Sequence, residues 1–538
     1  MRVLVIRILS ILALVIAVLW FIDGGGYESV ITAIVGIVGL FSGEFMKGDR
    51  ERVVVPGAES RDGRPGDSEE RPTRDSILVL PFDNISPDPE DAYFSDGLTD
   101  EIIMNLSRFN SLRVISRNST MVLKGSRRRT RDIAEELGVD YVLEGSVRKS
   151  GNDLRINAQL IDAQGDEQLW AERYDGVLDD IFGIQEEVSR SIVEALTLTL
   201  SPEEEMRLAE RPIVDPTAHD CYLRARHEYW KLTPQSLEEA HRHVLNGLHI
   251  VGENELLLAT LGYVTVQRIH FGIAAGPGNL PEAERLASKV LSINPDSAHG
   301  HSLLGWIRYA QGRPADAVAH FQTALGIDPN ILEAIAWMTI TCLSAGKHQA
   351  AAPYVQELIR IDPLTPVNHS LLGYWHALRG ESDKAIAVYR RTYEMDPENP
   401  WTQVLMGRMM VLLGEEESAR GPLERLARGD PDQPLVQHGT ILLHLLDGNT
   451  EEAAAAITPE LEEVSRQDSY LSWWMGDWFA VLGREEESVG WLRRAADLGF
   501  INWPVFSGID LFLDSIREGP VFEEFLEEIR GRWEAFEP

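Results

Sequence analysis

The sequence predicts three consecutive parts: an N-terminal transmembrane segment, an α/β domain, and an all-α superhelix built from repeated helix pairs. Three observations support this fold class. Residues 3–22 are almost wholly apolar, short β-branched runs alternate with helical patterns from residue 76, and glycine recurs every 34 residues between positions 278 and 448. A chain of 538 residues has room for several domains of ordinary size.

The apolar N-terminus predicts a membrane anchor over residues 1–46. Only Arg7 interrupts residues 3–22, and about twenty apolar residues span the hydrocarbon core of a bilayer. A shorter apolar stretch, residues 30–41, follows a glycine-rich loop. A cleaved signal peptide, a single anchor and a helical hairpin are the alternatives. The hairpin is favoured because basic residues flank both outer ends while the loop carries only acidic charges, which places the rest of the chain in the cytoplasm.

Two parts follow the anchor. Residues 47–75 are rich in Gly, Pro, Ser and charged side chains, a composition typical of a flexible linker. Residues 76–200 predict a compact α/β domain. Its expected strands are residues 77–82 and 112–116, followed by three antiparallel strands, and its expected helices are residues 95–108, a short helix that ends at Gly138, and a closing helix that begins near Ile181.

The three antiparallel strands are expected over residues 139–149, 154–162 and 168–174, joined by tight turns. Along the middle strand, apolar side chains from Leu154 to Leu160 alternate with polar ones, which predicts a sheet covered on one face.

Two charged clusters lie in this domain. Asp96, Asp100 and Glu101 are expected near the start of a helix, where carboxylates favour the helix dipole, and a metal or acid–base role is the alternative. The run from Lys124 to Arg131 (KGSRRRTR) is interpreted as a solvated loop, with a patch for phosphate, lipid headgroups or an acidic partner as the alternative.

Residues 217–500 predict about eight copies of one helix pair. The repeat residues keep their step of 34: a glycine that ends the first helix, an alanine in the second, and a proline after it, as in Gly312, Ala317 and Pro329. Glycine tolerates the left-handed conformation that ends a helix, and proline prevents the second helix from continuing. Gly305 and Ala317 are expected to be small because two helices cross there at close range. Residues 501–538 predict a capping helix, near 521–536, that covers the apolar end of the array.

The repeat pattern resembles the tetratricopeptide repeat, for which residues 297–330 are a nearly complete instance. The blocks VLPFDNISPDPEDAYFSDGLTDEIIMNLSR and VLEGSVRKSGNDLRINAQLIDAQGDEQLWAERYD in residues 76–200 resemble the TolB-amino-terminal-like domain of bacterial signalling proteins. In that family the domain usually follows an adenylate cyclase or a winged-helix DNA-binding domain, and tetratricopeptide repeats follow it. The 75 residues before it here are anchor and linker, so neither head is expected.

The composition and motifs predict a protein that is not an enzyme. The sequence has no Walker loop, GxGxxG, HExxH or GxSxG motif. Asp and Glu total 85 against 50 Lys and Arg, giving a net charge of −35, so nucleic acid is not expected as a partner. Cys221 and Cys342 are too few for a disulfide framework and are expected to be packed thiols. Histidines two apart, such as His299 and His301, point away from each other on a helix, so no metal or other cofactor is expected.

The expected function is a membrane-anchored, non-catalytic scaffold or adaptor for protein partners in bacterial signalling, at the inner membrane with a cytoplasmic body. A periplasm-facing envelope assembly factor and a degenerate cyclase-family enzyme are the alternatives, and the oligomeric state is left open. By the resemblance, the first helix of each pair lines a groove that binds a protein segment. Aromatic and Arg side chains on that stripe are the expected contacts, although packing between repeats is the alternative role for each. The predicted groove residues are His299, Trp306, Tyr309, Tyr374, Trp401, Arg408, Tyr470 and Trp473.

Overall fold

The computed structural model describes residues 75–538 except for 89–90, 110, 127, 178–180, 199–200, 202–203, 205–212, 230–233 and 271–278. The predicted anchor (1–46) therefore lies outside the described residues, as does the predicted linker (47–75) up to its last residue. No helix in the described part of the chain is long and apolar enough to cross a membrane.

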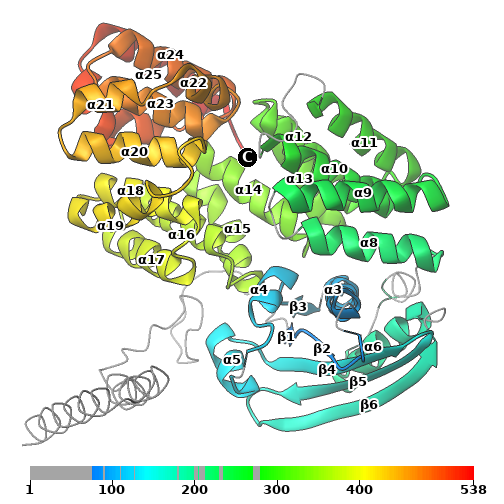
Figure 1. The fold of residues 1–538 in the computed structure, drawn as a ribbon. Helices are drawn as coiled ribbons and strands as arrows, with labels where there is room; N and C mark the ends of the chain where they lie inside the picture. The colour runs from blue at the N-terminus through cyan, green and yellow to red at the C-terminus, as the bar shows by residue number, and fades with distance from the viewer. Residues whose placement is uncertain are drawn as a thin grey trace, which may run out of the picture. The chain divides into compact units, whose positions relative to one another are not determined.

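The α/β domain is built on one mixed sheet with the strand order β3-β1-β4-β5-β6 (Figure 1). β1 pairs in parallel with β3 and β4, and β4, β5 and β6 form an antiparallel meander. A short strand, β2, also pairs with β4. The strands are β1 (Asp75–Val79), β2 (Asp83–Asn84), β3 (Leu112–Val114), β4 (Tyr141–Ser150), β5 (Asp153–Asp162) and β6 (Glu167–Val177).

Helices cover the sheet unequally. α3 (Ala92–Ser107) and α6 (Ile181–Ala195) pack on the face that carries Leu154, Ile156 and Leu160. α4 (Arg117–Val122) and α5 (Thr130–Leu137) lie on the other face beside β1 and β4. On that face of β5, Arg155 is exposed and Asn157 and Gln159 are half-buried. The half-covered sheet is thus confirmed, as is the left-handed stop of α5 at Gly138, whose φ is 62°. α4 was not predicted.

The predicted start of α3 was wrong. The helix begins at Ala92, and its first turn holds no acidic residue. Asp96, Asp100 and Glu101 lie in the second and third turns and are buried. They do not cap the helix, so the structure requires another explanation for their charge.

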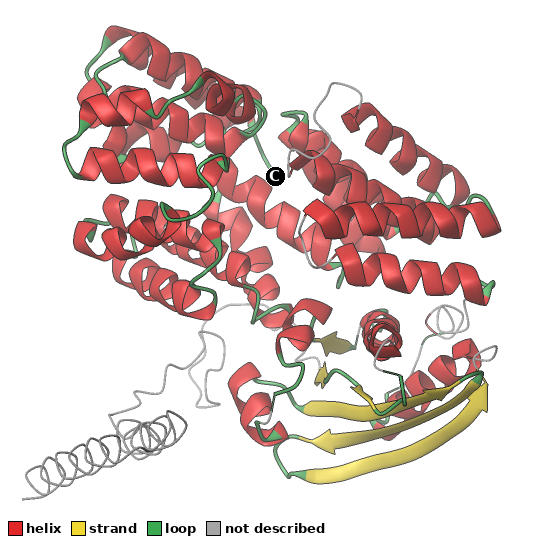
Figure 2. Cartoon of the chain, in the orientation of Figure 1, coloured by secondary structure: helices red, strands yellow, loops and turns green. Residues whose placement is uncertain are grey.

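Successive helix pairs follow the α/β domain in an array that runs from α8 to α24 (Figure 2). The helices are α8 (Pro216–Tyr229), α9 (Pro234–Val251), α10 (Glu255–His270), α11 (Asn279–Ile293), α12 (Ala298–Ala310), α13 (Pro314–Ile327), α14 (Leu332–Ser344), α15 (His348–Ile361), α16 (Pro366–Leu378), α17 (Ser382–Met395), α18 (Pro400–Leu412), α19 (Glu416–Leu426), α20 (Pro434–Leu446), α21 (Thr450–Ala455), α22 (Pro459–Ser465), α23 (Ser469–Val481) and α24 (Glu485–Asp497).

The repeat residues play the structural roles expected of them. Gly312, Gly346, Gly380, Gly414 and Gly448 all have φ between 66° and 80°, so each ends a first helix in the left-handed conformation. A Cβ at Gly305 would lie 2.4 Å from the ring of Phe321, which confirms that the two helices of this pair cross at close range.

The array ends in a segment that turns back against it. We call residues 498–519 the C-terminal segment; it holds a π-helical turn (Val505–Ile509) and a 3-10 turn (Leu511–Ile516) and leads into α25 (Pro520–Ala535). Phe500, Phe506 and Leu513 of this segment are completely buried in the main core of the array. The Asn502 side-chain amide donates to the carbonyl of Leu343 (2.9 Å) and to the Tyr374 hydroxyl (3.0 Å). The C-terminal segment is therefore tied to repeats in the middle of the array.

Candidate functional site

The predicted groove residues lie on the first helices of their pairs, and most of them face one another. Five of the eight side chains are at most 8% exposed: Trp306, Tyr309, Tyr374, Arg408 and Trp473. The other three are half-buried: His299, Trp401 and Tyr470. The five buried side chains therefore pack between helices in this structure, which is the alternative role that the sequence left open for them.

Three hydroxyl contacts join the inner faces of α12, α14 and α23. The Tyr309 hydroxyl on α12 lies 3.1 Å from the Ser344 hydroxyl on α14 and 3.4 Å from the Ser469 hydroxyl on α23. The Tyr470 hydroxyl lies 3.0 Å from the same Ser344. Residues some 160 positions apart thus share one hydrogen-bond network, and the inner face is narrow at this level.

Three more groove residues, Trp306, Trp401 and Trp473, lie against aromatic rings. The rings of Trp306 and Trp337 stack at 4.7 Å, and those of Trp473 and Phe500 at 4.5 Å. Trp401 meets Trp474 edge to face at 6.1 Å. Phe500 is the last residue of the predicted repeat range and lies in the C-terminal segment; it was not predicted as a residue of the inner face.

Arg408 is the centre of a buried charged cluster. Its guanidinium donates to the carboxylate of Asp477 and lies 3.3 Å from that of Asp510. Trp473 and Phe512 lie over it, at 4.4 and 4.9 Å from its central carbon, so the cation also contacts aromatic faces. Burial raises the pKa of both carboxyls, and Arg408 opposes that rise. The cluster holds α18, α23 and the C-terminal segment together.

The three carboxylates of α3 form a second charged cluster, which we call the α3–α8 seam. Each bridges one group of its own domain and one group of α8. Asp96 contacts Lys124 and His227; Asp100 contacts Arg117 and Arg226; Glu101 contacts Gln185 and His219. As the carboxylates advance along α3, their partners on α8 move back toward its start, so α3 and α8 run antiparallel.

The Lys and Arg side chains of the seam compensate the negative charge of Asp96 and Asp100. Burial alone would lower the pKa of Arg226, but Asp100 raises it above its ordinary value. Burial lowers the pKa of Arg117 in spite of the same carboxylate. The part of the chain that the structure describes contains no group of three His, Cys, Asp or Glu side chains that could hold a metal ion.

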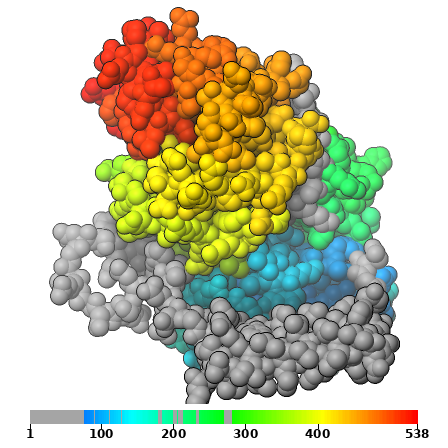
Figure 3. Space-filling model, turned by 60° about the vertical axis from the view of Figure 1, so that its left-hand side comes forward, coloured from blue at the N-terminus to red at the C-terminus, as the bar shows by residue number. Residues whose placement is uncertain are grey.

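Hydrogen bonds at two further places, Asp362 and Asn330, join the α/β domain to the array. The Ser116 and Ser119 hydroxyls donate to the Asp362 carboxylate at 2.5 and 2.6 Å, and the Asn330 amide donates to the Ser107 carbonyl at 2.6 Å. Asp362 immediately precedes a repeat proline, so a residue of the repeat pattern also serves as a docking point. Figure 3 shows the blue α/β domain directly against the yellow-green middle of the array.

Three basic side chains of the run from Lys124 to Arg131 contact acidic side chains. Lys124 belongs to the seam, while Arg128 and Arg131 contact Glu136 and Glu135 on α5 and are half exposed. These contacts agree with a solvated loop, except that Lys124 reaches a buried partner.

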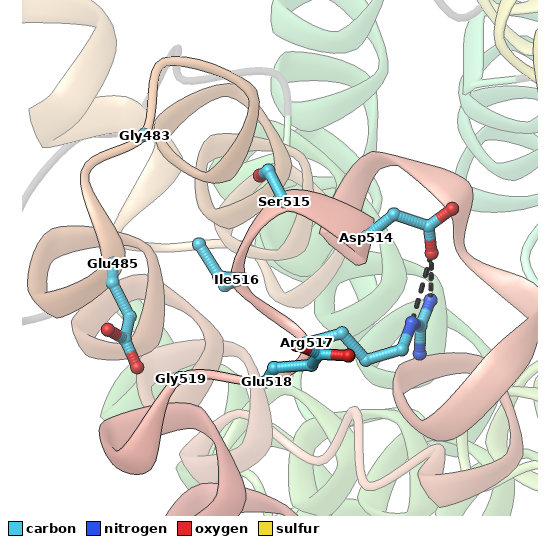
Figure 4. Close-up of a pocket in the computed structure, with 8 residues that line it drawn as sticks. All are labelled: Gly483, Glu485, Asp514, Ser515, Ile516, Arg517, Glu518 and Gly519. Carbon is cyan, nitrogen blue, oxygen red and sulfur yellow. Dashed lines mark hydrogen bonds and ion pairs between the residues drawn. The ribbon is translucent and has the colours of Figure 1, made fainter.

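A hollow of about 390 Å³ lies where α23, α24 and the C-terminal segment meet (Figure 4). Three of its charged groups have partners: Glu485 accepts the backbone N–H groups of Val521 and Phe522 at the start of α25, and Arg517 pairs with Asp514 at 2.7 Å. Glu518, which also lines the hollow, is exposed.

Comparisons with known proteins identify two regions. Residues 73–189 match a family model described as the HilA/YgeH-like transcriptional regulator, second domain, and residues 274–330 and 342–400 match a tetratricopeptide-repeat model. The chain therefore contains tetratricopeptide repeats. The TolB-like resemblance stays a prediction, because the family model that matches is another one.

The chain is similar to a "Putative adenylate cyclase 3" of Rhizobium meliloti (strain 1021), at 43% identity over 242 residues, or 44% of this chain and 41% of that protein. It thus matches less than half the length of this curated relative. Among solved structures, a tetratricopeptide repeat protein from Parabacteroides merdae is 13% identical with a TM-score of 0.34, over 51% of this chain and 99% of the other. TolB from Acinetobacter baumannii is 23% identical with a TM-score of 0.19, over 23% of this chain and 29% of TolB.

Proposed function

We propose that this chain is a membrane-anchored, non-catalytic scaffold that binds protein partners through its tetratricopeptide repeats in bacterial signalling or regulation. The array of helix pairs from α8 to α24 is the observation that supports this proposal most directly. Two of the three buried carboxylates of α3 are paired with basic side chains, Asp96 with Lys124 and Asp100 with Arg117 and Arg226, which favours a structural role for them.

The partner is a basic protein segment that contacts the half-buried groove residues. A net charge of −35 favours partners of opposite charge and speeds their association, more strongly at low ionic strength. Of the predicted groove residues, His299, Trp401 and Tyr470 keep part of their surface exposed, so these are the side chains through which a segment would be held.

Site-specific photo-crosslinking in the native bacterium tests this surface. A photoreactive residue at Trp401, on the first helix α18, is expected to capture a partner, and capture should fall as salt is raised. Glu424, exposed on the second helix α19, is the matched control and should capture much less. Equal capture at both positions would contradict groove binding.

The anchor is a separate proposal. We expect residues 1–46 to hold the chain in the inner membrane with the body in the cytoplasm, because basic residues flank the apolar stretch on both sides. An alkaline phosphatase fused after residue 538 is active only when exported. Low phosphatase activity with full-length fusion in the membrane fraction supports the proposal, whereas high activity means a periplasmic body.

An enzyme of the cyclase family is the second candidate, and the printed name of the Rhizobium meliloti relative is what favours it. The purified full chain with ATP and Mg²⁺ or Mn²⁺ distinguishes the two. We expect no cyclic nucleotide above a blank. Turnover that Asp100→Ala abolishes in a folded protein would establish the enzyme instead.

A further inference from the structure

β6 is the outermost strand of the sheet on the side away from β3 (Figure 2). It is 11 residues long, and most of its side chains are exposed. Within the described residues, its backbone makes hydrogen bonds to β5 and to no other element. A long edge strand with unpaired N–H and C=O groups is a template for another strand.

A bulge limits which part of β6 can pair. Leu160 of β5 lies opposite Trp170, but the next residue, Ile161, lies opposite Gln168, so Leu169 is an extra residue. Regular pairing geometry is therefore confined to residues 170–177. Any strand that pairs with this edge has to use that segment.

We propose that two copies of this chain associate by antiparallel pairing of their β6 strands, with Tyr174 of each copy opposite Tyr174 of the other. In this register Arg173 of one copy lies opposite Asp175 of the second copy, twice per dimer. Ala171 lies opposite Val177, and Glu172 lies opposite Gly176, which has no side chain to oppose it. Cross-strand pairs of opposite charge stabilise a sheet, and like charges destabilise it.

The neighbouring registers are worse. A shift that centres the pair on Arg173 puts two arginines opposite each other, and one that centres it on Glu172 does the same for two glutamates. Within each copy, Asp175 already contacts Arg155 of β5 at 2.6 Å and Arg173 at 2.8 Å. The proposed register continues that row of alternating charge across the dimer, so the charges on this edge select one self-complementary pairing.

Two charge-reversal variants test the register directly. Arg173→Asp gives a copy with two acidic residues at the pairing positions, and Asp175→Arg gives a copy with two basic ones. Each variant alone is expected to lose self-association at least tenfold. Mixed together, they should form a heterodimer, because both cross-strand pairs are again opposite in charge. Sedimentation equilibrium of the full chain in detergent, with the variants labelled by different fluorophores, measures all three.

Cysteine crosslinking provides a second readout that does not depend on affinity. Copies that carry both Ala171→Cys and Val177→Cys should form a covalent dimer on mild oxidation, since these positions face each other in the proposed register. Ala171→Cys alone is the control and should not crosslink, because position 171 of one copy is then far from position 171 of the other. A wild-type chain that stays monomeric at about 100 µM, or a mixture of the two reversal variants that fails to associate, would overturn the proposal.

Discussion

At the scale of single residues, burial decides what the charged and aromatic side chains can do. Arg408 has the residue type and position expected of a ligand contact, yet it is 1% exposed and meets two carboxylates. Removing one partner of such a cluster is far more costly than breaking a surface ion pair. Residue type alone could not separate the two roles, because both favour Arg and aromatic residues on the first helix of a repeat.

His438 makes a prediction about pH. The indole N–H of Trp478 donates to Nδ1 of His438 at 2.9 Å, and Nε2 lies 3.2 Å from the Ser465 hydroxyl, so the ring is neutral with its proton on Nε2. Burial, assisted by the charge of Arg408, lowers the pKa of His438 to about 3. In the unfolded chain the same ring takes up a proton near pH ~6.5.

Because the folded pKa is depressed, the unfolded state binds more protons below pH ~6.5, and stability falls as the pH falls. One such group contributes a slope of about 1.4 kcal/mol per pH unit. His438→Gln, which keeps an acceptor for Trp478, should remove that slope. Urea unfolding of the wild type and of His438→Gln at pH 7.5, 6 and 5 measures the difference in their free energies of unfolding. The carboxyls of Asp477 and Asp510, whose pKa is raised, contribute a pH slope of opposite sign. Both proteins contain these carboxyls, so their contribution largely cancels in the difference. Parallel pH profiles would show that His438 is not the titrating group.

At the scale of the element, short-range patterns were predictable and long-range contacts were not. The repeat glycines, the close crossing at Gly305 and the three-stranded meander follow from signals within a few dozen residues. The start of α3 was missed because Asp96 and Asp100 were expected near it, whereas the N-cap is Asp91. The seam was missed because Glu101 and His219 lie 118 positions apart, and neither side chain carries a local sign of its partner.

Gly312 and Gly380 have nearly the same φ but different surroundings, so alanine substitutions at the two positions distinguish the cost of backbone strain from the cost of a steric clash. Gly380 has φ 72° and open space where a Cβ would lie, so Gly380→Ala should cost about 1 kcal/mol of stability for the left-handed conformation alone. Gly312 has φ 70°, but a Cβ there would lie 1.9 Å from the carbonyl oxygen of Asp497 at the end of α24. Gly312→Ala should therefore cost about 1–3 kcal/mol more, because the last repeat has to move.

Chemical denaturation of the two variants gives both values. Equal losses at the two positions would mean that the contact between α12 and the end of α24 does not persist in solution. The array would then be more open at this level than the structure describes.

At the scale of the whole molecule, the α/β domain is attached to the array at widely separated points of the sequence. α8 supplies the seam, and the loops at Asn330 and Asp362 supply the other docking contacts. Repeat arrays usually unfold by steps, because each repeat contacts only its neighbours. The seam and the docking contacts join the α/β domain to several repeats, and the C-terminal segment contacts repeats in the middle of the array. The described part of the chain is therefore expected to unfold more cooperatively than an open solenoid.

Asp100→Ala tests this coupling. It leaves Arg117 and Arg226 without their shared carboxylate, and an uncompensated buried charge costs about 3–5 kcal/mol. Calorimetry of the wild type should give one main transition, and the variant should give two, with the α/β domain melting first. Glu135→Ala, which breaks an exposed pair with Arg131, is the matched control and should keep one transition within a degree or two of the wild type. Two well-separated transitions in the wild type, or a single shifted transition in Asp100→Ala, would show that the seam does not couple the domain to the array.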